Sequence, residues 1–492
     1  MDIGQKAAKG FFSILTRNVI ARIMGLVSMV VLARVLSPSD FGLVSITEVL
    51  LNVIAVFGVT GVFEFLVSYQ GEDREEMNQS AFWFNIVAGV AIVALVLIAA
   101  PFWAESQGDG RIVSLGYLVA GIFLVSCLQI LPKSILSHRL DFETQTRLQN
   151  PFIILTPIGK IACAYLGFGV YSLLLPTLFF GIVQTFLFYR AVHWKFQISL
   201  LAHRWKEIYG FSKHLIGATL LTKITDDGDK IILAKFLGLE ALGIYNLASQ
   251  LAHLFTSNVV SITNQIFSAT FPKYAHDKAL MLARYLQVTK VIAFFSVPLL
   301  CCMAIAAKPM IILVYSEKWS AAILPFQILT VYAIFRTITS SYGSVINSLL
   351  VPQKAFYLSL VYAPVHLTAS IMGSQYGIVA LAAGVVFVKL VFVQYNIYQV
   401  ATLLGSTVKK FYANLSAIAA SASAASLAGF AVGLLPMESN FAQVLSIGTV
   451  FLLIYLVVLK WVSLREVREV RDFFLKANRR AGLVFGKVFL LK

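Results

Sequence analysis

The residues in this 492-residue chain with the clearest chemical potential lie in one stretch, LLTKITDDGDKIILAKFLG, at positions 220–238. Four of its charges recur at i, i+3, i+4 and i+7, which places them on one face of a helix. They are Lys223, Asp226, Asp227 and Lys230. Ammonium groups bind oxyanions as point charges, whereas carboxylates can exchange a bound cation for a cationic cargo. The face therefore indicates a binding site for a charged molecule.

The surroundings of this stretch define the class of protein. The chain is 59% hydrophobic and 13% charged, against about 45–50% and about 25% in soluble domains. Apolar runs of about 18 or more residues are candidate membrane spans, and they recur along the chain. We expect about fourteen spans, near residues 11–35, 39–68, 80–104, 112–132, 150–168, 169–193, 208–236, 240–268, 284–307, 319–350, 354–373, 375–402, 411–435 and 441–460. The predicted fold class is an all-α polytopic membrane protein.

The net charge of +16 follows membrane topology. If Lys6 and Lys9 are cytoplasmic, the even-numbered connections and the C-terminal tail carry most of the basic residues. The remaining connections hold only Arg34, Arg111, Lys235, Lys308 and Lys318. This asymmetry is the positive-inside pattern, and it predicts an inner or plasma membrane protein with both termini in the cytoplasm. Nucleic acid is not needed as a partner to explain the basicity.

The four cysteines indicate no metal site. Cys127, Cys163, Cys301 and Cys302 all lie inside apolar runs and lack the spacing of metal ligands. Free cysteine packs as a small hydrophobic residue. We therefore expect buried, inert thiols, with no metal and no cofactor.

An internal repeat organises the chain. ARVLSPSDFGLVSI at 33–46 is echoed by AKFLGLEALGIYNL at 234–247, an offset of 201 residues from Ala33 to Ala234. A second echo relates FGVYSLLLP at 168–176 to YGIVALAAG at 376–384. Because six spans separate equivalent points, both copies enter the membrane from the same side. Parallel repeats of this kind are related by an axis along the membrane normal, with the substrate site between them.

Two six-span lobes and the paired turns together resemble the multidrug/oligosaccharidyl-lipid/polysaccharide (MOP) superfamily, and within it the Wzx-type polysaccharide repeat-unit flippases. The resemblance covers roughly residues 1–408 and implies a V-shaped fold like that of the MATE transporters. It also implies that spans one, two, seven and eight line a central cleft. The predicted divisions are an N-lobe at 1–206, a C-lobe at 207–408, two additional spans at 409–460, and a basic amphipathic cytoplasmic tail at 461–492.

The repeat offset connects the charged face to the first span. Lys223 corresponds to Arg22, which lies with Asn18 and Gly25 on a polar or small stripe. A charge at the bilayer centre costs about 2.5–3.5 kcal/mol on insertion scales, so these charges must either face a wet cavity or pair with one another. We expect the seventh span to face the cleft. The alternative is a structural network of i,i+4 ion pairs, Lys223 with Asp227 and Asp226 with Lys230.

Further charges lie within other predicted spans. Arg336 sits in a span rich in hydroxyl groups, VYAIFRTITSSYGSVINSLL, and is as much a candidate ligand contact as a structural residue. Glu48, Lys160 and Lys389 are candidate coupling or cavity charges. For these three, a buried pair or an interhelical hydrogen bond is the favoured explanation.

Cations in a cleft favour an anionic cargo, and the resemblance implies which one. The expected function is to flip a polyprenyl-diphosphate-linked oligosaccharide from the cytoplasmic to the outer leaflet of a bacterial inner membrane by alternating access. Such a protein serves exopolysaccharide, O-antigen or capsule export and is not an enzyme. The expected partners are the lipid-linked oligosaccharide, membrane lipids, and a polysaccharide polymerase or other export machinery.

Two other functions remain open at this point. A cation-coupled drug or metabolite antiporter of the same fold would use the carboxylates at Asp226, Asp227 and Glu48, although the excess of basic residues argues against a cationic cargo. A membrane polysaccharide polymerase or ligase would typically carry a sizeable outside loop with catalytic residues. The outside connections here are short, and no nucleophile–base or metal constellation is apparent.

Overall fold

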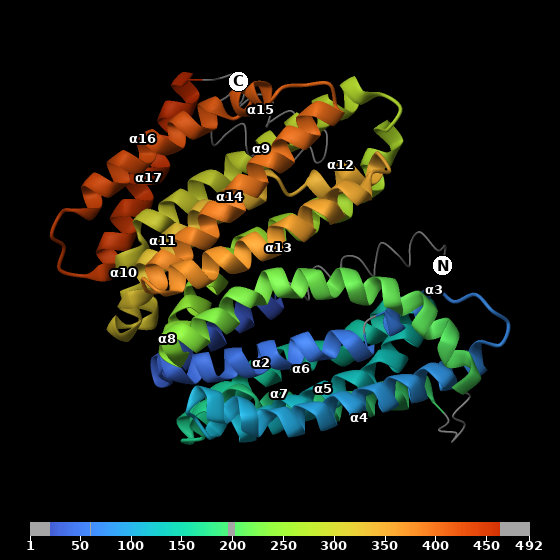
Figure 1. Cartoon of the computed structure of the whole chain (residues 1–492). Helices are drawn as coiled ribbons and strands as arrows, with labels where there is room; N and C mark the ends of the chain where they lie inside the picture. The colour runs from blue at the N-terminus through green and yellow to red at the C-terminus, as the bar shows by residue number, and fades with distance from the viewer. Residues whose placement is uncertain (1–19, 60, 195–201, 463–492) are drawn as a thin grey trace. The chain divides into compact units, whose positions relative to one another are not determined.

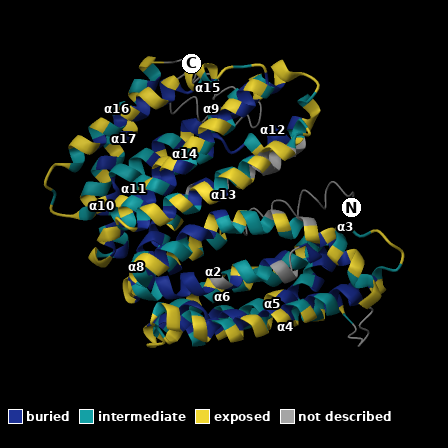
Figure 2. Ribbon diagram, in the orientation of Figure 1, coloured by how far each residue is buried: buried dark blue, intermediate teal, exposed yellow. Residues whose placement is uncertain are grey.

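The computed structural model describes residues 20–59, 61–194 and 202–462 (Figure 1). Regular structure in this part of the chain is helical. Asn18, the basic segment ahead of the first span and the predicted tail after residue 462 lie outside the described residues. The chain divides into two compact units, Met1–Ile244 and Tyr245–Lys492. Figure 2 shows how buried and exposed residues are distributed along their helices.

Ten helical segments in the described part are long and apolar enough to cross a membrane. The expectation was fourteen. Predicted spans 208–236 and 240–268 both lie in α8 (Trp205–Thr270), where Gly238 interrupts the helical backbone with φ 84° and ψ 176°. Predicted spans 150–168 and 354–373 correspond to helices that are not among the ten. The structure therefore confirms a multi-pass helical membrane protein, and the count of fourteen stays a prediction.

The first unit is built from a helix over residues 20–35 and the helices that follow it. These are α2 (Pro38–Val59), α3 (Val62–Ser68), α4 (Arg74–Gln107), α5 (Arg111–His138), α6 (Phe142–Tyr165), α7 (Leu175–Val192) and the first part of α8, with short 3-10 turns η1 (Gly169–Leu173) and η2 (Ala202–Arg204). α5 packs against α2, α3, α4 and α7. Two hydrophobic clusters fill the unit, one around Leu43, Ile112 and Leu115, the other around Met77, Phe188 and Ile208.

The beginning of α8 is anchored to the acidic loop GEDREEM at 71–77. Arg204 forms an ion pair with Asp73 and a second with Glu207 at 3.3 Å. It also donates to the Tyr69 hydroxyl at 3.1 Å. This acidic loop, which is an exception to the basic pattern of the other even-numbered connections, therefore binds a basic residue of the same chain. Trp205–Ile244 belongs to the first unit, and the predicted lobe boundary at 206/207 stays a prediction.

The second unit contains the rest of α8 and the helices after it. These are α9 (Lys278–Ile305), α10 (Ala307–Tyr315), α11 (Ile323–Ile338), α12 (Tyr342–Ser348), α13 (Pro352–Ser374), α14 (Ile378–Leu403), α15 (Val408–Ala413), α16 (Ser416–Gly433) and α17 (Asn440–Val462), with 3-10 turns η3 (Phe271–Tyr274) and η4 (Glu317–Ala322). α11 packs between α9 and α14, and α16 packs against α9 and α17. The core lies around Tyr285, Phe294 and Phe451.

Candidate functional site

The two repeated turns lie against each other. A Cβ atom on Gly42 would lie 1.8 Å from the carbonyl oxygen of Leu239, and a Cβ on Gly243 would lie 1.8 Å from the carbonyl oxygen of Pro38. The repeat offset converts Pro38 into Leu239 and Gly42 into Gly243. The contact is therefore symmetric, with each glycine facing the carbonyl of the other copy. Any side chain at either position would collide with backbone.

The two turns have different local structures. In the first copy Ser37 caps α2: its backbone N–H donates to Asp40 Oδ2 at 3.0 Å, and its hydroxyl accepts from the Asp40 backbone N–H at 3.2 Å. This reciprocal arrangement is a capping box. In the second copy Gly238 occupies the position of Ser37 and turns the chain with a positive φ, which glycine adopts without strain. Arg34 and Lys235, the equivalent cations before the turns, are both exposed.

The charged face of α8 centres on Asp227. This carboxylate belongs to a residue that is only 7% exposed. Its Oδ1 accepts a 2.7 Å hydrogen bond from Lys230 Nζ, and its Oδ2 lies 3.8 Å from Lys223 Nζ. Lys223 keeps 36% of its side chain exposed, and Asp226 is exposed. The predicted pair Lys223–Asp227 is present, and Lys230 pairs with Asp227 at i,i+3. Ion pairing and an accessible face thus occur together.

Charges from two other helices join this face within the first unit. Glu48 on α2 interacts electrostatically with Lys160 on α6, and with Lys230 and Asp227 on α8. We call these four residues and Lys223 the α2–α6–α8 charge cluster. It contains three lysines and two carboxylates, and a further carboxylate, Asp226, lies on the same face of α8. Glu48 is exposed and interacts with two cations, Lys160 and Lys230; the roles of Glu48 and Lys160 stay predictions.

Arg336 and Lys389 lie near one face of α11 in the second unit. Arg336 Nη1 donates to His253 Nδ1 at 3.0 Å. Lys389 Nζ lies 5.1 Å from the ring centroid of Tyr332, a cation–π contact. Tyr332 and Arg336 are four residues apart and so lie on the same side of their helix. The structure therefore brings two of the predicted candidates towards one surface.

Three polar residues were not singled out by the sequence analysis as functional candidates. His253 lies 83 positions before its partner Arg336, and its one sequence signal was a lone histidine within an apolar span. Lys290, inside α9, is 9% exposed, and Asp229 on α8 is 3% exposed.

Arg22 lies half-buried on the helix over residues 20–35. Within the described residues, no group of three or more His, Cys, Asp or Glu side chains has the arrangement of a metal site.

The fold defines the class of protein. The structure of a lipid II flippase, MurJ, in an inward closed conformation superposes with a TM-score of 0.71 at 16% identity, covering 90% of this chain and 97% of that one. A MATE family transporter of the MOP superfamily, in an inward-facing conformation, shares this multi-pass helical fold at a TM-score of 0.62 and 14% identity, covering 79% of this chain and 96% of that one. Residues 31–324 match the model of a family described as polysaccharide biosynthesis protein, and the chain belongs to that family.

Curated relatives agree with this family. The teichuronic acid biosynthesis protein TuaB of Bacillus subtilis is 26% identical over 295 residues, which is 58% of this chain and 60% of that protein. The lipopolysaccharide biosynthesis protein WzxC of Escherichia coli is 19% identical over 426 residues, 84% of this chain and 85% of that protein. The match to TuaB thus spans about 60% of its length. Together with the matched family, these relatives confirm the resemblance to Wzx-type polysaccharide biosynthesis proteins.

Proposed function

We propose that this protein flips a polyprenyl-diphosphate-linked oligosaccharide from the cytoplasmic to the outer leaflet of a bacterial inner membrane, and that both of its termini are cytoplasmic. The family, WzxC and TuaB are named for polysaccharide or cell-surface polymer biosynthesis, and MurJ is named a lipid II flippase. Flipping moves the lipid between leaflets without breaking a bond, so the proposed activity is transport rather than catalysis. A polysaccharide polymerase or export machinery receives the product.

The observation that carries the proposal is the gathering of three lysines, Lys160, Lys223 and Lys230, in the α2–α6–α8 charge cluster. Charges within membrane-spanning helices are expensive and usually mark a pathway or a binding site. Asp227 holds Lys223 and Lys230 on one face, while their side chains retain 36% and 22% exposure. Glu48, on a second helix, interacts electrostatically with Lys160 and Lys230. Asp227 thus positions two lysines whose partly exposed side chains can bind a phosphate.

The second unit has its own donors that suit an anion. Arg336 is held by His253, which accepts from it and is therefore neutral at Nδ1. A guanidinium fixed in this way can bind an oxyanion through two parallel hydrogen bonds. Lys389, lying over Tyr332, supplies a further positive charge. We propose Arg22, Lys223, Lys230 and Arg336 as cargo contacts, with Asp227 as their positioning residue and Asp226 at the accessible edge.

Movement of the cargo requires two lobes that rock. We propose residues 1–206 and 207–408 as parallel lobes, with 409–460 as an additional helix pair. Gly42 and Gly243, each facing the backbone carbonyl of the other turn, join equivalent points of the two proposed repeats. A glycine contact without interlocking side chains separates at low cost. The paired turns therefore serve as the outer seal, which opens when the cargo leaves.

A deletion strain tests the function. Loss of the protein should cause one lipid-linked oligosaccharide to accumulate in the cytoplasmic leaflet, where a membrane-impermeant hydrolase added to inverted vesicles can cleave it. Re-expression of the protein should restore polymer export and remove the accumulated intermediate. Accumulation of unlinked or over-long polymer instead would indicate a polymerase or ligase. A normal polymer, with loss of resistance to a cationic drug, would indicate the antiporter.

A further inference from the structure

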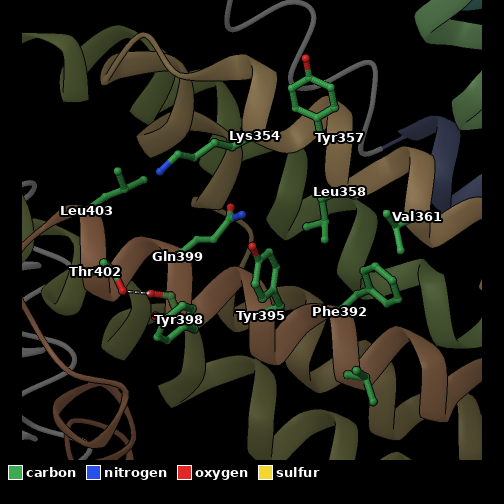
Figure 3. Close-up of a pocket in the computed structure, with 11 residues that line it drawn as sticks. Lys354, Tyr357, Leu358, Val361, Phe392, Tyr395, Tyr398, Gln399, Thr402 and Leu403 are labelled. Carbon is green, nitrogen blue, oxygen red and sulfur yellow. Dashed lines mark hydrogen bonds between the residues drawn. The ribbon is translucent and has the colours of Figure 1, made fainter.

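A groove of about 610 Å³ lies between α13 and α14 in the second unit (Figure 3). Its walls are formed by residues 354–361 of α13 and residues 391–403 of α14. Tyr357, Tyr395 and Tyr398 line it, and these side chains are 66%, 45% and 55% exposed. None of the charged candidates for cargo binding lines this groove. The groove is therefore separate from the proposed cargo contacts.

The groove is polar at one end and apolar at the other. Because α13 begins at Pro352 and α14 ends at Leu403, the two packed helices run in opposite directions and bring these ends together. The polar end holds Lys354, Gln399 and Thr402, and the apolar end holds Leu358, Val361 and Phe392. From Lys354 to Val361 the helix rises about 10 Å. The polar end of the groove thus lies near the ends of the two helices, and the apolar end lies farther along them.

The polar end supplies hydrogen-bond donors. The side chain of Gln399 points into the groove between Lys354 and Tyr395 (Figure 3). Its residue is 8% exposed, and its Oε1 accepts a 2.8 Å hydrogen bond from the Tyr342 hydroxyl. Because the oxygen is fixed on Tyr342, the amide NH₂ is the group that can serve a ligand. A primary amide and the exposed Lys354 ammonium together favour an anion.

The charge balance indicates what kind of anion this is. Lys354 is the single formal charge among the lining residues, with neither Asp nor Glu beside it. One cation matches the single negative charge of a phosphodiester, whereas a diphosphate would call for more. The apolar end suits a hydrocarbon chain, and tyrosines commonly lie at the level of lipid headgroups. A phospholipid combines these chemical features in one molecule.

We propose that this groove binds one anionic phospholipid, with the phosphodiester at Lys354 and Gln399 and an acyl chain along Leu358, Val361 and Phe392. Lys409 and Lys410, exposed just after α14, lie at the same end of the helix as Lys354. By the positive-inside rule this end is cytoplasmic, so the lipid comes from the cytoplasmic leaflet. The leaflet rests on the proposed topology, but the binding itself does not depend on the cargo.

Photo-crosslinking tests the site. The full-length protein is placed in nanodiscs with phosphatidylglycerol carrying a diazirine on its acyl chain, and labelled peptides are mapped. We expect labelling of α13 and α14 beside Val361 and Phe392. A basic residue near an anionic membrane surface contributes about 1 kcal/mol, so Lys354→Ala should weaken competition by unlabelled phosphatidylglycerol about fivefold. Lys354→Arg should retain this competition. The control Lys308→Ala, at an exposed lysine on the outer side of the proposed topology, should leave it unchanged.

Further arms identify the lipid. Val361→Trp should fill the apolar end and abolish labelling there, while size exclusion and thermal unfolding confirm an intact protein. Phosphatidylcholine should compete about fivefold less well than phosphatidylglycerol, since its headgroup carries no net charge. Equal competition by the two lipids, or an unchanged Lys354→Ala variant, would overturn the proposal. Stronger competition by polyprenyl phosphate would also overturn it, by assigning the groove to the cargo lipid; export assays would then still test the flippase function separately.

Discussion

Gly42 and Gly243 each face the backbone carbonyl of the other's turn, at Leu239 and Pro38 respectively. These four residues form two pairs related by the same 201-residue offset. Sequence identity at the two glycines is therefore explained by a shared steric demand, because the opposing carbonyl leaves no room for a Cβ. The contact links a weak internal repeat to a specific place in the structure.

Replacing Gly42 by alanine tests this relationship. The added methyl group must displace the Leu239 carbonyl, and overpacking of this kind typically costs about 1–3 kcal/mol. We expect Gly42→Ala and Gly243→Ala each to lower the thermal unfolding temperature in detergent and to impair export. Gly217→Ala is the matched control, since Gly217 also lies on α8 and has open space around its Cα. Equal melting temperatures for Gly42→Ala and Gly217→Ala would contradict the close contact.

Asp227 is expected to position the lysines rather than to contact the cargo. Lys230→Ala removes its 2.7 Å partner, and breaking a buried ion pair from one side costs about 3–5 kcal/mol. We therefore expect low abundance for Lys230→Ala. The double change Lys230→Ala with Asp227→Asn should restore abundance, measured by quantitative immunoblotting of membranes, without restoring export. Restored export in the double variant would show that the pair is only structural.

The same test applies to Lys223, which lies farther from Asp227. At 3.8 Å and with 36% of its side chain exposed, Lys223 contributes less to stability than Lys230. We expect Lys223→Ala to keep near-normal abundance and to lose most polymer export, quantified by sugar analysis of the cell surface. Normal export in this variant would remove Lys223 from the set of cargo contacts.

Arg22 provides a test of geometry as well as charge. Arg22→Ala should abolish export, and Arg22→Lys should retain part of it, because the charge remains but the planar fork is lost. Arg34 lies twelve positions later on the same helix and is exposed, which makes Arg34→Lys a matched control. Abundance and membrane insertion should be unchanged in all three variants. An Arg22→Ala strain that exports normally would contradict the proposed role.

His253 is expected to hold the Arg336 guanidinium. A hydrogen bond to a charged group contributes about 1.5–3 kcal/mol, so His253→Phe should lower thermal stability and weaken export together. His253→Gln offers a replacement acceptor and should recover much of both. If Phe and Gln at this position behave alike, the 3.0 Å hydrogen bond has no energetic importance.

The sequence supported some of these conclusions and could not reach others. Helical periodicity placed Lys223, Asp227 and Lys230 on one face because their spacing is local. Which lysine pairs with which carboxylate was harder to predict, because i,i+3 and i,i+4 ion pairs are close in energy. In the structure Lys230 pairs with Asp227. Contacts between helices could not be predicted, because helical periodicity carries no information about which helix faces pack together.

Two interhelical interactions illustrate that limit. Glu48 and Lys160 are separated by more than a hundred residues, and nothing in either span indicates the other. Arg336 and His253 are likewise distant in sequence. In the described part of the chain ten segments qualify as spans, and α8, which is interrupted at Gly238, contains two of the predicted fourteen. The repeat, in contrast, identified in advance the two turns that prove to be in contact.

Flipping by the purified protein in proteoliposomes tests the central claim most directly. A polyprenyl-diphosphate-linked oligosaccharide is placed in one leaflet, and its arrival in the other is followed with an impermeant hydrolase. We predict movement well above that in protein-free vesicles, abolished by Arg22→Ala and retained by Arg34→Lys. Movement no faster than in protein-free vesicles, or the same rate for a cargo analogue lacking phosphate, would contradict an anion-binding flippase.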